Sequence, residues 1–388
     1  MEVATRIRKL PPYLFAQIEQ KIAEEKEKGR EILDLGIGDP DLPTPSFIVD
    51  KLCEEARKPQ NHRYPSYRGL YEFRKAVAEW YLRRFGVKLD PEREVVSLIG
   101  SKEGIAHFAW CAVDPGDIVL ASDPGYPVYK IGSMLAGGIP LELPLLPEND
   151  FLPDFSRFPQ EVLEKTRLVF INYPNNPTSQ VASLDFFKEV VELARRYNFI
   201  IAHDLAYSEI AFDGYRAPSI LEVEGAREVA IEFHSLSKTF NMTGWRIGFA
   251  VGNEKLIEAL GRIKTNVDSG IFNAIQWAGV EALSRTEEVL EWLLPIYQKR
   301  RDLVVRTLSK VGIEIKPPKA TLYVWIPIPL GFNSLDFANF LLDKAGVVVT
   351  PGIGFGRYGE GFVRISLTTP DAVLEKAMNR VEEALRRY

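Results

Sequence analysis

The sequence predicts an α/β protein with a large domain, built on a mostly parallel sheet covered by helices, and a smaller α+β domain. Between residues 95 and 251, short apolar runs alternate with segments of helical period, which is typical of a parallel sheet. After about residue 280 the pattern changes to long amphipathic segments with few apolar runs. The 388 residues also exceed the roughly 250–300 at which a single core stops growing.

Three divisions of the chain are expected. Residues 1–44, which contain Pro11, Pro12 and a stretch rich in glycine and proline, should form an N-terminal arm and a loop that joins the smaller domain. Residues 45–283 should form the large domain and residues 284–388 the smaller one.

In the large domain, two helices and six strands are predicted. One helix covers residues 71–85 and stops at Gly86, and the other begins at Ser183, presents an apolar face and ends near Asn198. The expected strands are residues 95–99, 118–121, 168–171, 199–202, 229–233 and 247–251.

In the smaller domain, Ser284 and Glu287 have the spacing of a capping box, so a long helix is expected from there to about residue 311. Pro295 should kink this helix or divide it in two. The last helix should begin at residues 369–370. The expected strands are residues 321–325, 346–350 and 362–366.

The composition excludes several classes of function. A net charge of -5 gives no basic excess to attract nucleic acid or acidic lipid. No apolar run approaches the ~18–20 residues of a membrane span, and the N-terminus lacks a signal-peptide pattern, so a cytoplasmic protein is expected. Cys53 and Cys111 are expected to be buried thiols, and neither a disulfide framework nor a metal site is predicted.

Two apolar runs end on polar side chains that could share one site. Residues 229–234 lead into Lys238, which lies among serine, threonine and glycine residues. A lysine is usually a solvated surface residue, but this context favours a reactive amine. Residues 199–203 end on Asp204, with Tyr207 three residues later. Because both runs are expected in the same sheet, these side chains should meet at its edge.

This set of groups fits pyridoxal 5′-phosphate. The Lys238 amine can hold the aldehyde of this cofactor and act as the base that moves a substrate Cα proton. Asp204 can keep the ring nitrogen protonated, or it can cap a short helix expected through Tyr207. Tyr207 and Asn176, which follows the run at residues 168–171, can donate to the phenolic oxygen.

The phosphate and the ring also have candidate partners. Residues 100–104, with Ser101 and Lys102 at their centre, join a strand to a helix, so free N–H groups and the helix dipole face an anion there. Tyr126, after another strand, is expected to stack on the ring. Hydroxyl and guanidinium groups for the phosphate come from Ser235, Ser237 and Arg246.

Together these residues resemble the fold-type-I pyridoxal-phosphate aminotransferases of the aspartate aminotransferase superfamily, over essentially the whole chain. The resemblance implies a seven-stranded sheet and a homodimer with shared active sites. Gly38 resembles the loop glycine that presents its backbone to the substrate, and Tyr64 the tyrosine that reaches the neighbouring subunit's cofactor. Arg364 resembles the arginine that binds the substrate α-carboxylate, and substrate contacts are also implied for Tyr126 and Asn176.

A narrower resemblance, to the LL-diaminopimelate aminotransferases, is carried by residues 9–15, 64–67 and 233–246. It implies amino transfer between LL-diaminopimelate and 2-oxoglutarate in lysine biosynthesis, and a substrate contact for Tyr13. Two departures are Ser179, where many members have glycine, and Asp268-Ser269, where longer members carry an asparagine. Broad-specificity aspartate or alanine aminotransferases are the alternative.

Other classes of protein share parts of the pattern. Ser235 and Lys238 fit the Ser-x-x-Lys motif of acyl-serine hydrolases, although the companion tripeptides of that class do not occur. Gly354, Gly356 and Gly359 match a dinucleotide fingerprint, yet a strand is expected after them where the fingerprint requires a helix. A binding module would require an inert Lys238, and a pyridoxal-dependent lyase, racemase or cyclopropane-forming synthase could share the same anchors. The prediction is an aminotransferase with ping-pong kinetics.

Overall fold

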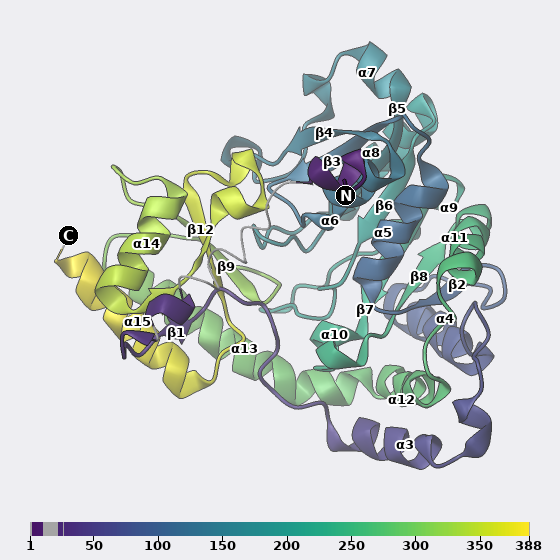
Figure 1. Cartoon of the computed structure of the whole chain (residues 1–388), viewed down its shortest axis with the longest axis horizontal. Helices are drawn as coiled ribbons and strands as arrows, with labels where there is room; N and C mark the ends of the chain where they lie inside the picture. Colours follow the sequence, from purple (N-terminus) through teal and green to yellow (C-terminus); the bar gives the residue numbers. More distant parts are fainter. Residues whose placement is uncertain (1, 11–21, 26, 388) are drawn as a thin grey trace.

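The computed structural model describes residues 2–10, 22–25 and 27–387. Seven strands form one sheet in the order β2-β8-β7-β6-β5-β3-β4 (Figure 1). Neighbouring strands are parallel except at β8, which is antiparallel to β2 and β7. The predicted mostly parallel sheet is confirmed. Its strands are β2 (Val95–Leu98), β3 (Ile118–Asp123), β4 (Ile139–Pro144), β5 (Thr166–Asn172), β6 (Ile200–Asp204), β7 (Ala230–Ser235) and β8 (Gly248–Gly252).

One strand of this sheet was missed. β4 contains Pro140 and Pro144, and proline within a run argues against a central strand. The structure places β4 at the edge, paired only with β3. A proline is tolerated there because one side of an edge strand donates no ladder hydrogen bonds.

Helices cover both faces of this sheet. Alternate residues of β5 enter different cores: Val169 packs in one cluster and Phe170 in the other. Helices α5, α6 and α11 cover the Phe170 face, and α4, α8 and α12 the opposite face. The helices of this part are α3 (Ser46–Ala56), α4 (Tyr71–Phe85), α5 (Ser101–Ala112), α6 (Val128–Ala136), α7 (Gln160–Lys165), α8 (Leu184–Tyr197), α9 (Ala226–Val229), α10 (Leu236–Thr239), α11 (Glu254–Val267) and α12 (Asn273–Ser284).

The two predicted helices of this region are confirmed, with their ends. The Ser183 hydroxyl accepts a hydrogen bond from the Phe186 N–H (3.2 Å) at the start of α8, and Asn198 ends that helix in a left-handed conformation. Gly86, with φ of 69°, ends α4.

A second, smaller sheet has the order β11-β12-β9 and is antiparallel. Beside it, β1 pairs in parallel with β10, so the start of the chain lies against this part (Figure 1). The long helix α13 runs between the two parts of the molecule. The remaining elements are α1 (Thr5–Arg8), β1 (Leu33–Asp34), α13 (Thr286–Ser309), β9 (Tyr323–Pro327), α14 (Ser334–Ala345), β10 (Val347–Val348), β11 (Thr350–Pro351), β12 (Phe362–Ser366) and α15 (Asp371–Arg386).

The predicted capping box at Ser284 is wrong. Ser284 is the last residue of α12, and its hydroxyl donates to the Glu281 carbonyl (2.8 Å), so it cannot cap the next helix. Only Arg285 separates α12 from α13, which has no side-chain cap. Pro295 lies inside an uninterrupted α13, which excludes a division into two helices.

The cysteines also differ from expectation, because Cys53 is exposed and Cys111 only half-buried. Within the described residues, no helix combines the length and the apolar character that crossing a bilayer requires.

Candidate active site

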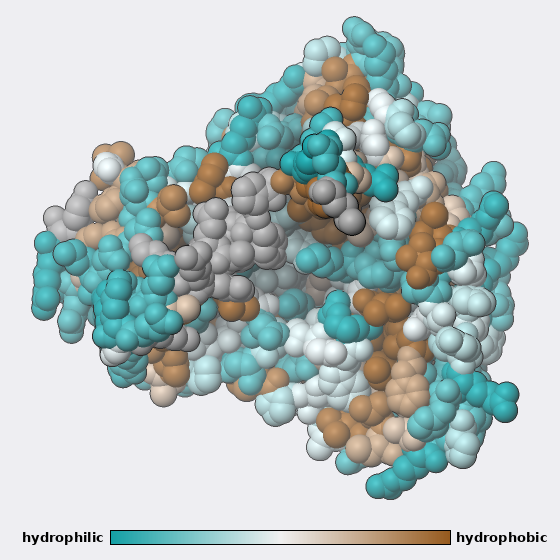
Figure 2. Space-filling model, viewed as in Figure 1, coloured by the Kyte–Doolittle hydropathy of each residue, from teal (hydrophilic) through white to brown (hydrophobic). Residues whose placement is uncertain are grey.

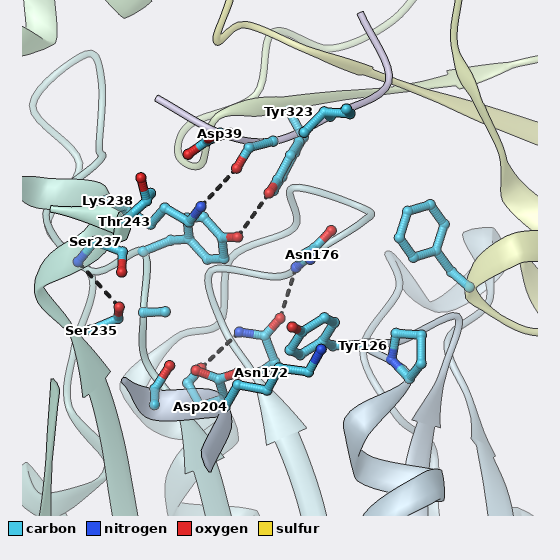
Figure 3. A pocket seen from close by; sticks show the side chains of 18 of the residues that line it. Asp39, Tyr126, Asn172, Asn176, Asp204, Ser235, Ser237, Lys238, Thr243 and Tyr323 are labelled. Atoms are coloured by element: carbon cyan, nitrogen blue, oxygen red, sulfur yellow. Dashed lines mark hydrogen bonds between the residues drawn. The ribbon is translucent and has the colours of Figure 1, made fainter. Parts of the chain in front are cut away.

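A cavity of about 390 Å³ lies between the two sheets, at the carboxyl ends of β5, β6 and β7 (Figure 3). Its large-sheet side contains the predicted residues Ser101, Lys102, Tyr126, Asn176, Asp204, Tyr207, Ser235, Ser237, Lys238 and Arg246. Its small-sheet side consists of Ile37, Gly38, Asp39, Tyr323, Phe355 and Arg364.

One predicted site residue, Tyr64, does not line this cavity. Tyr64 is 87% exposed and lies elsewhere on the surface, which leaves its predicted role toward a neighbouring subunit as a prediction. Tyr13 lies outside the described residues.

Lys238 extends from the short helix α10, which follows β7 directly. Its Nζ donates to the Gly38 carbonyl (2.7 Å), so the amine faces the cavity beneath the N-terminal loop. The Ser235 hydroxyl caps α10 by accepting from the Ser237 N–H (3.2 Å). Among the described residues no hydrogen bond joins Ser235 to Lys238, so the couple that a Ser-x-x-Lys hydrolase needs is not formed.

Asp204 is the last residue of β6 and is buried. Its Oδ2 accepts from the Tyr129 hydroxyl (2.8 Å), whereas its Oδ1 has no hydrogen-bond partner within the described part of the chain. Burial raises the pKa of Asp204 to about 6, against the lowering effects of Tyr129 and His203. The alternative role as a helix cap is wrong, because residues 206–209 form a turn and no helix. A buried carboxylate oxygen without a partner fits a protonated ring nitrogen in the cavity.

A buried hydrogen-bond network lies next to Asp204. His203 Nδ1 lies 2.7 Å from the Glu232 carboxylate, and His203 Nε2 lies 3.1 Å from the Tyr173 carbonyl. The Tyr173 carbonyl can only accept. Burial alone would raise the pKa of Glu232, but its hydrogen bonds with His203 and Ser219 outweigh burial and hold this pKa below its usual value. His203 Nε2 donates to the Tyr173 carbonyl, and the His203 ring is held next to Asp204, whose pKa it lowers.

The expected phosphate end lies at the start of α5. Gly100 has φ of 78°, which favours glycine, and a Cβ there would displace the Arg246 guanidinium. Arg246 Nη1 donates to the Thr243 carbonyl (2.7 Å), which directs the guanidinium towards this helix end. Because α5 has no side-chain cap, its first N–H groups are free to bind an anion. Lys102 Nζ lies 5.5 Å from the ring centroid of Tyr126.

Arg364, in β12, connects the two sides of the cavity. Its Nη1 donates to Asn176 Oδ1 (2.8 Å) and its Nη2 to the Gly36 carbonyl (2.7 Å). The guanidinium also lies over the rings of Tyr323 (4.1 Å) and Phe355 (4.7 Å). A buried, oriented guanidinium of this kind can bind a carboxylate through two parallel hydrogen bonds.

The loop that carries Phe355 is fastened to the large sheet by Asp123, at the end of β3. The buried Asp123 carboxylate accepts from the Tyr358 N–H (2.9 Å) and pairs with Lys130. Gly356 has φ of 132°, and a Cβ there would overlap this carboxylate. The Gly354–Gly359 motif thus lies in two short 3₁₀ helices, Gly352–Phe355 and Arg357–Gly359, that pack against β3, and β12 follows them.

A residue of α13 holds the N-terminal loop, residues 36–41, in place. Arg300 binds the Asp41 carboxylate with both terminal nitrogens (2.7 and 3.0 Å) and the Asp371 carboxylate with Nε (2.8 Å). This buried guanidinium holds residues 36–41 over the cavity.

Several lining residues were not found from the sequence. Asn172 donates to the Asp204 carbonyl (2.7 Å) and accepts from the Asn176 N–H (2.8 Å). Its place at the end of β5 was a usable signal, as was the position of Tyr129, one helical turn after Tyr126. No comparable local signal marks Asp39, Tyr323 or Phe355.

Comparisons with known proteins agree with this geometry. The model of the family "Aminotransferase class I and II" matches residues 30–381. The chain is 58% identical over 384 residues to an LL-diaminopimelate aminotransferase of Desulforudis audaxviator, covering 99% of this chain and 98% of that protein. It is 57% identical over 385 residues to one of Moorella thermoacetica, covering 99% of each.

Among solved structures, substrate-bound BacF of Bacillus subtilis superposes with a TM-score of 0.94 at 41% identity, over 99% of this chain and 98% of that one. A Thermus thermophilus aspartate aminotransferase double mutant superposes with a TM-score of 0.92 at 28% identity, over 99% and 100%. With matches of this length and identity, the chain belongs to the aminotransferase class I and II family.

Proposed function

We propose that this aminotransferase uses pyridoxal 5′-phosphate to transfer an amino group between LL-diaminopimelate and 2-oxoglutarate, a step of lysine biosynthesis. The observation that carries the proposal is the position of Lys238, Asp204 and Arg364 around one cavity. They supply an amine that faces the cavity, a buried carboxylate oxygen without a hydrogen-bond partner among the described residues, and a buried guanidinium. The substrate is supported by eight relatives, 51–58% identical over nearly their full length, that carry the name LL-diaminopimelate aminotransferase.

The residues present fit this cofactor. When bound, pyridoxal phosphate supplies an aldehyde that exchanges amino groups and a protonated ring that withdraws electrons from the substrate Cα. Asp204 Oδ1 would accept from the ring nitrogen, and Tyr207 and Asn176 would contact the phenolic oxygen. The phosphate would be held by the start of α5, with Ser101, Ser235, Ser237 and Arg246.

Three side chains of the site would have different roles in the reaction. Lys238 would hold the aldehyde of the cofactor, and its amine, which faces the cavity, would act as the base that moves the substrate Cα proton. Arg364 fixes the α-carboxylate, so that the Cα–H bond lies within reach of the Lys238 amine. Asp204, with a pKa of about 6, would supply a negative charge that favours a protonated ring nitrogen and so the transition state.

We also propose that the working unit is a homodimer. Tyr64, Tyr67, Val267 and Phe272 are exposed aromatic or apolar residues. Gly270 lies against Pro65, so the two segments that carry them are neighbours. Figure 2 shows apolar side chains gathered over the part of the surface where Figure 1 places α3 and α12. Contiguous apolar surface of this kind marks interaction sites.

The test is an initial-rate assay of purified protein with 2-oxoglutarate and separate amino donors. LL-diaminopimelate should exceed aspartate, alanine and the aromatic amino acids in kcat/KM by about 100-fold or more, because a second polar end must be recognised. Double-reciprocal plots should be parallel, as ping-pong kinetics require. Preference for aspartate or alanine would assign the chain to broad-specificity amino transfer, and a colourless, borohydride-insensitive protein would refute the cofactor.

A further inference from the structure

Tyr323, in β9 of the small sheet, is 3% exposed and lines the cavity. Its hydroxyl lies 2.9 Å from the Tyr207 hydroxyl (Figure 3). We propose that Tyr323 is a positioning residue of the reaction centre, which holds the Tyr207 hydroxyl so that the Tyr207 hydrogen points into the cavity. This inference rests on the proposed function, in which Tyr207 donates to the phenolic oxygen of the cofactor.

Hydrogen-bond counting sets the direction of the contact. A phenol has one hydrogen and can also accept. When Tyr207 donates into the cavity, only its oxygen lone pairs remain for Tyr323, so Tyr323 must be the donor between the two. Two hydrogen bonds in series polarise each other, which makes Tyr207 a stronger donor than an isolated phenol.

The charges around Tyr323 favour the same direction. The charged groups that face its hydroxyl are Arg364 of β12, Lys238 of α10 and Asp39 of the N-terminal loop. Burial alone would raise the pKa of Tyr323, but Arg364, Lys238 and the hydrogen bond with Tyr207 together outweigh it, and this pKa lies below its ordinary value. Burial and Tyr323 raise the pKa of Tyr207 well above its ordinary value. The more acidic hydroxyl is the better donor.

Two strained residues fix the backbone of Tyr323. Ser179 has φ of 58° and Thr321 φ of 76°, a region that residues other than glycine seldom adopt. The Ser179 hydroxyl donates to the Tyr323 carbonyl (2.7 Å), and the Thr321 hydroxyl accepts from the Tyr323 N–H (3.1 Å). The two hydroxyls are 2.8 Å apart, so Thr321 donates to Ser179. Such strain persists where surrounding contacts over-determine the backbone, as at functional sites.

This arrangement also accounts for two features of the sequence. Ser179, which departs from the glycine of many family members, links the turn after β5 to the start of β9. At Gly38, a Cβ would overlap the Tyr323 hydroxyl, so the loop that accepts from Lys238 can close over the cavity only with glycine there.

The experiment measures the pH midpoint of the visible absorbance of the protein loaded with pyridoxal phosphate, with thermal melting as a check of folding. Loss of a donor to the phenolic oxygen should raise the midpoint, because that oxygen then carries negative charge less readily. Tyr207→Phe should raise it by about 1 unit and Tyr323→Phe by about 0.5 unit, as expected for one direct and one indirect hydrogen bond. The double variant should shift no more than Tyr207→Phe alone, since Tyr323 acts through Tyr207.

The control is Tyr215→Phe, which removes a hydroxyl that donates to the Ala182 carbonyl (3.2 Å) away from the cavity, and it should leave the midpoint unchanged. Ser179→Gly should shift the midpoint in the same direction as Tyr323→Phe by a smaller amount, and an unchanged midpoint would overturn the anchoring role of Ser179. An unshifted Tyr323→Phe variant with wild-type melting, or additive shifts in the double variant, would overturn the positioning role. Wild-type protein without a visible band would instead overturn the proposed function, and this inference with it.

Discussion

The two sides of the cavity are assembled in different ways. On the large-sheet side, Asp204 ends β6 and Lys238 lies three residues after the end of the adjacent parallel strand β7, so the sheet itself brings them together. On the small-sheet side, Gly38, Tyr323, Phe355 and Arg364 come from separate segments, held by contacts such as Arg300 with Asp41 and Asp123 with the Tyr358 N–H. We therefore expect the large-sheet side to govern turnover and the small-sheet side to govern substrate affinity.

The largest expected effect is on the large-sheet side. Lys238→Ala should lower kcat by about 10⁴-fold, because it removes the group that carries the Cα proton, while the protein still binds pyridoxal phosphate. Mass spectrometry after borohydride reduction should find a covalent adduct in the wild type and in the exposed control Lys255→Ala, and none in Lys238→Ala. An adduct in the Lys238→Ala variant would transfer the role to another lysine.

A smaller loss of turnover is expected from Asp204→Asn. The variant keeps the hydrogen bond with Tyr129 but removes the negative charge beneath the ring nitrogen, and kcat should fall by about 10²–10³-fold. KM should change much less. Pre-steady-state kinetics can measure the half-reaction directly, and an undiminished rate would show that the carboxylate charge is not used.

The same carboxylate should destabilise the cofactor-free protein. Its pKa is about 6 when folded and about 3.9 when unfolded, so the folded state prefers the protonated form. The contribution of Asp204 to the free energy of unfolding should fall by about 3 kcal/mol as pH rises from about 4 to 6, and remain lower above that range. Denaturant unfolding of Asp204→Asn should lack this fall, whereas the exposed control Asp50→Asn should retain it.

On the small-sheet side, Arg364→Ala should raise KM for every α-carboxylate substrate alike, by about 10–100-fold, as expected for lost hydrogen bonds to a charged group. Arg364→Lys should recover only part of the loss, because it lacks the planar fork. Steady-state kinetics with LL-diaminopimelate, aspartate and 2-oxoglutarate measure this directly. Loss confined to one substrate would contradict the assigned role.

The smallest effect is expected at the loop behind Phe355. Gly356→Ala places a methyl group against the Asp123 carboxylate and should displace this loop, raising KM about 10-fold with kcat nearly unchanged. Gly361→Ala is a matched control, since Gly361 also has positive φ (90°) but open space around its Cα. It should lower the melting temperature without changing KM. Equal KM changes in both variants would show that Asp123 does not position the loop.

Sequence reasoning recovered the large-sheet side almost completely. Hydrophobic runs marked six of its strands, and polar residues at their carboxyl ends identified Asp204, Asn176 and Lys238, because strand ends of a parallel sheet converge by geometry alone. The errors of the sequence analysis were local. The edge strand β4 was missed because it contains prolines, and Ser284, which ends α12, was wrongly assigned as a helix cap. Tyr129 was passed over, although it lies one helical turn after Tyr126 and reaches Asp204.

The sequence by itself determined the fold class, the large sheet and the set of groups at its edge, since each is encoded in contiguous residues with a fixed period. Only the tertiary structure decided which small-sheet residues meet them. Tyr323 lies beside Tyr207 through contacts between residues more than a hundred positions apart, such as Ser179 with Tyr323 and Arg364 with Asn176. No local period encodes such contacts, because they depend on how the two sheets pack against each other.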